Sequence, residues 1–159
     1  MTLLDAMTTP LLIYGIGNVG RQDDGLGPLL VEQLESHGVP SGVTLDSGYQ
    51  LLPEDALLVS RHASVIFVDA TSAADADAPY SLTRIVPAEH PSSFTSHTMR
   101  PEALLALCQT LYGAAPPAFT LSIPARLFGI NEPLSAQAAV NLDAAVRDLR
   151  WAISTPLTT

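Results

Sequence analysis

The hydrophobic positions of the chain fall into short blocks that alternate between β-strand and α-helix character. Apolar runs, several of them rich in β-branched and aromatic side chains, predict buried strands at residues 11–14, 43–46, 65–68, 81–86 and 118–123. Leucine and alanine at helical spacing predict helices at residues 28–35, 53–59, 101–112 and 136–151. Pro101 is expected to open the third of these helices, Gly113 to close it, and Ser135 to cap the fourth. Helices therefore connect most of the predicted strands, as they do in proteins with parallel sheets.

This order of elements predicts an α/β fold, a three-layer α/β/α sandwich around a mostly parallel, twisted sheet of about five strands. We expect residues 1–159 to form a single domain, with residues 1–10 and 152–159 as loose termini, because no repeat or linker interrupts the pattern. Functional sites of such sheets form at the carboxyl ends of the strands. Candidate chemistry is therefore expected in the loops that follow the strands.

The charge balance removes several classes of function. The chain has a formal net charge of -9, and all seven of its basic residues are scattered arginines. Nucleic-acid binding depends on clustered basic residues, so we expect no nucleic-acid partner. The absence of lysine excludes a Walker A phosphate loop and a lysine Schiff base.

No segment of the sequence has the length and hydrophobicity of a membrane span, and the first residues do not have the pattern of a signal peptide. We therefore expect a cytoplasmic protein without a membrane partner. The single cysteine, Cys108, lies in an apolar helical run and is predicted to be a core residue rather than a nucleophile.

The loop after the first strand matches a dinucleotide-binding motif, because residues 15–20 read Gly-Ile-Gly-Asn-Val-Gly. In that motif a helix starts among the glycines and its N-terminus binds the pyrophosphate. Here the helix is predicted to start later, and the carboxylates of Asp23 and Asp24 precede it, where they would repel a phosphate. Asp46 could still accept a ribose hydroxyl, so a Rossmann-type dinucleotide-binding protein stays an alternative.

Three side chains form a candidate metal site. Asp24 and Asp69 follow the first and third strands, so both are expected at one edge of the sheet, and His97 precedes a helix in a long loop that can fold over that edge. Either Asp23 or Asp24 alone could simply cap a helix. Together, two carboxylates and one imidazole would suit a divalent transition metal with open positions, which supports a hydrolase hypothesis.

Several segments resemble the [NiFe]-hydrogenase maturation endopeptidases. The resemblance covers the first loop at residues 13–18 and 21–27, the third strand end at 67–70, the histidine segment at 96–105, and residues 134–135 before the last helix. It implies a protease that removes the C-terminal extension of the hydrogenase large-subunit precursor after nickel insertion. The family's metal-contacting residues, which are also its catalytic residues, carry over to Asp24, Asp69 and His97.

The resemblance also implies that the nickel is supplied by the substrate, although other divalent metals can occupy such a site. Asp24 is glutamate in some family members, Asp23 is the competing ligand, and His90 is an alternative to His97. Water activated by a carboxylate is the simplest nucleophile, and the choice between an aspartic-type and a metal-dependent endopeptidase stays open. We expect a monomer. A nickel-sensing protein that docks on the large subunit without cleaving it is a further alternative.

Overall fold

A central sheet of five strands organises the computed structural model, which describes residues 1–72, 77–89 and 99–155. The strands are β1 (Leu11–Ile16), β2 (Val43–Gly48), β3 (Ser64–Thr71), β4 (Ser81–Ile85) and β5 (Ala118–Pro124), in the order β2-β1-β3-β5-β4. All neighbours are parallel except β4, which runs antiparallel to β5. The predicted mostly parallel sheet is confirmed.

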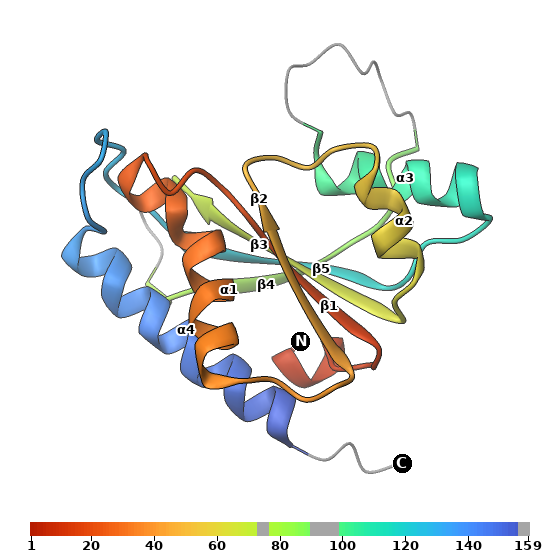
Figure 1. Cartoon of the computed structure of the whole chain (residues 1–159), viewed down its shortest axis with the longest axis horizontal. Coiled ribbons are helices and arrows are strands. Elements are labelled where there is room, and N and C mark those ends of the chain that lie inside the picture. Colours follow the sequence, from red (N-terminus) through yellow and green to blue (C-terminus); the bar gives the residue numbers. More distant parts are fainter. Residues whose placement is uncertain (73–76, 90–98, 156–159) are drawn as a thin grey trace.

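Helices cover both faces of this sheet (Figure 1). On one face α1 (Leu26–His37) packs beside α4 (Ala136–Ser154), and on the other α2 (Asp55–Ser60) packs beside α3 (Pro101–Tyr112). Each face has its own apolar core, because the strand side chains alternate between the two layers of helices. The predicted α/β/α sandwich is therefore also confirmed.

The local signals for two helices are borne out in detail. Pro101 occupies the first turn of α3, and Gly113 ends that helix in the left-handed conformation, with φ of 86°. The side chain of Ser135 caps α4 by accepting a hydrogen bond from the Ala138 amide at 3.3 Å. Cys108 is fully buried in α3, as predicted for a core residue.

Two boundaries near the candidate site differ from the prediction. β3 continues to Thr71, so Asp69 lies within the strand and not after its end. The pairing of β3 with β5 extends to Pro124 and holds these last residues in the sheet. A 3-10 turn, η2 (Gln22–Gly25), precedes α1, which starts at Leu26, and both Asp23 and Asp24 belong to this turn.

Three of the first ten residues, Leu3, Ala6 and Met7, are buried, so the terminus that was expected to be loose is packed in part. The first ten residues include the short 3-10 helix η1 (Leu3–Ala6), whose apolar side chains join the core between the sheet and α4. The buried Ser64 hydroxyl donates a 2.9 Å hydrogen bond to the Ala6 carbonyl oxygen.

At the C-terminal end, α4 continues to Ser154, three residues beyond the predicted end. In the described ranges there is no helix of the length and hydrophobicity needed to cross a membrane.

Candidate functional site

Asp24 and Asp69 lie at the carboxyl edge of the sheet, as the sequence predicted. β1 and β3 are direct neighbours, with Gly15 opposite Val68, and the loop that leaves β1 returns across this edge in η2. One oxygen of Asp24 accepts a hydrogen bond from the Asn18 amide at 3.0 Å. One oxygen of Asp69 accepts from the Ala70 amide at 2.8 Å. Each carboxylate therefore keeps an oxygen with which it could bind a cation or another donor.

The electrostatic environment of Asp69 makes it the most unusual acid of the site. Its pKa is raised from an ordinary 3.8 to about 6, mainly by burial and to a smaller extent by the negative charge of Asp24. The Ala70 amide and the positive charge of Arg100 act in the opposite direction without cancelling this shift. A carboxyl group with this pKa changes its protonation state near neutral pH, which suits general acid and base catalysis.

Asp23, next to Asp24 in the chain, has a different and structural role. It is completely buried, and its carboxylate accepts four hydrogen bonds from the β5–α4 loop, which comprises residues 125–135. The donors are the Arg126, Leu127 and Ser135 amides at 3.0, 3.1 and 2.8 Å, and the Ser135 hydroxyl at 2.7 Å. Burial tends to raise the pKa of Asp23, but these hydrogen bonds outweigh it and the pKa is lowered. Asp23 has little capacity left for a metal, which favours Asp24 as the ligand.

The β5–α4 loop is the part of the site that the sequence did not predict, apart from the resemblance at residues 134–135. Besides the Asp23 contacts, the Gln22 side chain accepts from the Gly129 amide at 2.9 Å, and the Gly20 carbonyl accepts from the Asn131 amide at 2.9 Å. Gln22 and Asn131 both have positive φ, at 51° and 54°, a conformation that such residues keep only where tertiary contacts hold them. The two loops are thus fastened to each other.

Glycines of the first loop serve close packing of the backbone. A methyl group on Gly15 would overlap the Gly27 carbonyl, and one on Gly17 would overlap the Asp24 carbonyl. The chain's own turn therefore fills the space beside these glycines. The Asn18 amide is bound by the Asp24 carboxylate, and Asp46 accepts a local hydrogen bond from the Ser47 amide at 2.8 Å. This geometry disfavours the dinucleotide alternative.

His97, the third predicted ligand, and His90, its alternative, lie outside the described residues. Just after them, Met99 forms an antiparallel bridge with Leu51, and the charge of Arg100 acts on Asp69. Within the described ranges, no three His, Cys, Asp or Glu side chains form a group that could hold a metal ion. The complete ligand set stays a prediction.

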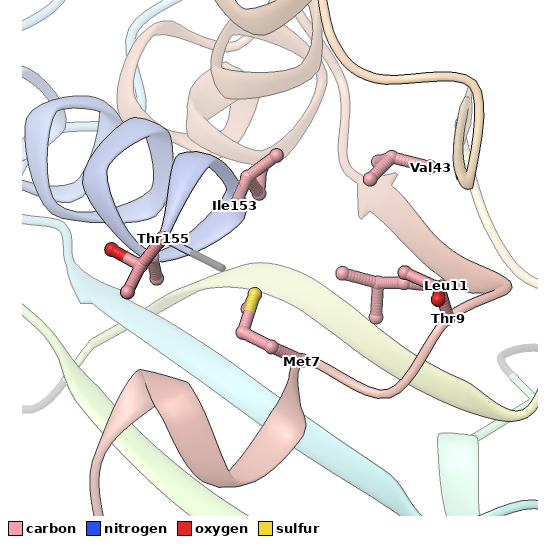
Figure 2. Close-up of a pocket in the computed structure, with 7 residues that line it drawn as sticks. Met7, Thr9, Leu11, Val43, Ile153 and Thr155 are labelled. Carbon is pink, nitrogen blue, oxygen red and sulfur yellow. The ribbon is translucent and has the colours of Figure 1, made fainter. Parts of the chain in front are cut away.

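A hollow of about 230 Å³ lies at the opposite edge of the sheet and does not belong to this site. Figure 2 shows its lining, which comes from the starts of β1 and β2, the N-terminal segment and the end of α4: Met7, Thr9, Leu11, Val43, Ala152, Ile153 and Thr155. None of these residues carries a charged or nucleophilic group suited to the predicted chemistry. The hollow is thus separate from Asp24 and Asp69, which lie at the carboxyl edge of the sheet.

No protein-family model matches this sequence, and no curated protein matches it. Its fold, however, is similar to solved structures of hydrogenase maturation proteases. It superimposes on the [NiFe] hydrogenase maturation protease HycI from Thermococcus kodakarensis with a TM-score of 0.75 and 17% identity, over 96% of this chain and 99% of that one.

Similar agreement is found with the hydrogenase maturating endopeptidase HybD from E. coli, at a TM-score of 0.70 and 19% identity over 89% and 90% of the two chains. The hydrogenase 2 maturation peptidase from a Thaumarchaeota archaeon gives 0.65 and 20% identity over 91% and 97%. At these identities the likeness shows a shared fold over nearly the whole chain. The fold expected from the resemblance is confirmed.

Proposed function

We propose that this protein is an endopeptidase that removes the C-terminal extension of a [NiFe]-hydrogenase large-subunit precursor after nickel insertion. The observation that carries the proposal is the pair of carboxylates, Asp24 and Asp69, at the carboxyl edge of the sheet in a fold shared with hydrogenase maturation proteases. The precursor is the partner, and the protein acts in the cytoplasm as a monomer.

The charges of the site fit a cation that arrives with the substrate. Burial and, to a smaller extent, the negative charge of Asp24 raise the pKa of Asp69, and a bound divalent cation would stabilise both carboxylates in their ionised form. Carboxylate oxygens and an imidazole nitrogen are suitable donors for nickel. Asp24, Asp69 and His97 would therefore complete the coordination of nickel held by the precursor, so that cleavage follows metal insertion.

The position of the described neighbours supports His97 as the third ligand. Two peptide units, about 7 Å of extended chain, separate His97 from Met99, which pairs with Leu51. Arg100, one residue further, is close enough to Asp69 for its charge to lower the pKa of that carboxyl.

In the proposed reaction, nickel carried by the substrate and contacted by Asp24, Asp69 and His97 would supply a Lewis acid beside the scissile carbonyl. Asp69 in its ionised form accepts a proton from the attacking water and can return it to the leaving amine. Asp24, whose backbone is held in η2, fixes the position of the cation relative to Asp69. The value of kcat/KM, which reports the free enzyme, should therefore rise with pH through about 6, as Asp69 ionises.

Incubation of the purified protein with nickel-loaded and nickel-free precursor, followed by mass spectrometry, tests the proposal. We expect shortening of the nickel-loaded precursor alone, and its loss in Asp24→Asn, Asp69→Asn and His97→Ala. Asp46→Asn is a matched control, because Asp46 is an exposed acid at the end of β2 with only a local contact.

The outcomes separate the alternatives. Full activity of Asp24→Asn would overturn the site assignment. Nickel-dependent binding of the precursor without shortening would replace the protease by the docking protein. Tight binding of NAD(H), weakened by Asp46→Asn, would instead establish the dinucleotide alternative.

A further inference from the structure

Four large apolar side chains are exposed where the β1–α1 loop and the β5–α4 loop meet. The exposed fractions are 61% for Val19, 52% for Leu127, 37% for Phe128 and 77% for Ile130. The Gly20–Asn131 and Gln22–Gly129 hydrogen bonds place the two loops side by side, beside the amino end of α4 (Figure 1). Clustered exposed apolar side chains are typical of interaction surfaces.

The buried Asp23 carboxylate fixes both ends of the loop that carries Leu127, Phe128 and Ile130. Two of its four hydrogen bonds come from the amides of Arg126 and Leu127, and the Asp23 amide donates to the Leu127 carbonyl at 3.0 Å. The apolar side chains are thus exposed to solvent on a backbone that hydrogen bonds hold in place. Binding to a preorganised surface loses less conformational entropy than binding to a loose loop.

Two exposed arginines belong to this surface. Arg21 and Arg126 are exposed within the two loops, and neither forms an ion pair with any other described residue. Glu132 is the only acid in residues 125–135, and the acids of the β1–α1 loop are the buried Asp23 and the site residue Asp24. Exposed arginines beside apolar side chains complement a ligand that combines apolar residues with carboxylates.

We propose that Val19, Leu127, Phe128 and Ile130, with Arg21 and Arg126 at the sides, form a docking surface for an apolar segment of the protein substrate that is flanked by acidic residues. The surface is continuous with the candidate active site, because Asp23 holds it and Asp24 is the next residue of the same turn. A segment bound there would bring the adjoining substrate chain to the two carboxylates. This inference deepens the proposed function and rests on it for the identity of the partner.

Fluorescence anisotropy with a labelled synthetic peptide tests the surface directly. The probe is a short run of Leu, Ile and Phe flanked by Asp and Glu, compared with the same run flanked by Lys. We expect the acidic peptide to bind, and Ile130→Asp and Arg126→Glu each to weaken binding about tenfold, since central apolar anchors and desolvated charges dominate such interfaces. Added salt should weaken binding to the wild type more than to Arg126→Glu.

Matched controls are Val140→Asp and Arg150→Glu, exposed residues of α4 outside the two loops, which should leave binding unchanged. Equal binding by Ile130→Asp and the wild type, or preference for the lysine-flanked peptide, would overturn the proposal. Because the peptide assay needs no turnover, peptide binding without precursor cleavage would refute the protease alone. Cleavage of precursor by Ile130→Asp with unchanged KM would refute the docking surface alone.

Discussion

Replacement of Asp23 by alanine should destabilise the protein far more than replacement of its neighbour Asp24. Asp23→Ala removes the acceptor for three backbone amides and one hydroxyl, whereas Asp24→Ala removes the acceptor for the single Asn18 amide. A hydrogen bond to a charged acceptor contributes about 1.5–3 kcal/mol. Because the two side chains are identical and adjacent in the chain, any difference in the loss of stability reflects their different surroundings.

The four bonds do not add in full. Removal of Asp23 also relieves the desolvation of a buried charge, and water can reach the amides of Arg126 and Leu127, which are exposed residues. We therefore expect Asp23→Ala to lower the free energy of unfolding by about 3–5 kcal/mol and Asp24→Ala by about 1 kcal/mol. The first value is a large part of the stability of an ordinary domain, which is about 5–15 kcal/mol.

Urea unfolding at neutral pH, followed by circular dichroism, measures both values. Because the folded-state pKa of Asp23 is lowered, its contribution is present above pH 3.8 and is lost as the pH falls through that lowered pKa. The difference between Asp23→Ala and the wild type should shrink accordingly in acid. A change below about 1 kcal/mol at neutral pH would refute the structural role of this carboxylate.

Three further predictions concern stability. The folded-state pKa of Asp69 is raised from 3.8 to about 6, so its contribution to stability is fully present below pH 3.8 and is lost as the pH rises through 6. In urea unfolding, Asp69→Asn should therefore match the wild type in acid and be about 1–3 kcal/mol more stable than the wild type at neutral pH. Gly27→Ala should lower the free energy of unfolding by at least about 3 kcal/mol, because the methyl group would lie 2.5 Å from the Ile16 oxygen and 2.6 Å from the Val68 oxygen. The control Gly38→Ala, where the methyl group meets open space but φ is 85°, should lower it by only about 1 kcal/mol. Equal effects of the two substitutions would contradict the close packing of the backbone at Gly27. Tyr80→Phe should lower thermal stability by about 1 kcal/mol through loss of the 2.6 Å bond to Asp148, an effect that should vanish in the Asp148→Ala background.

Local patterns along the chain were sufficient for most of the fold. Proline in the first turn and glycine at the end predicted α3 at its observed bounds, and Ser135 was correctly predicted as the cap of α4. These signals act within one or two helical turns, so they can be read without knowing the rest of the structure. The N-terminal residues were harder, because their order depends on packing against α4 and Ser64.

The sequence by itself determined the kind of fold and the placement of Asp24 and Asp69 at one edge, since parallel strands end together. Only the tertiary structure decided what the two neighbouring acids do. Asp23 finds its partners 103–112 residues away in the β5–α4 loop, and no local pattern reveals a contact over that separation. The raised pKa of Asp69 likewise comes from burial and from charges on other elements. Long-range burial and hydrogen bonding therefore divide three aspartates of similar sequence context into one that supports the structure and two that are proposed to act in catalysis.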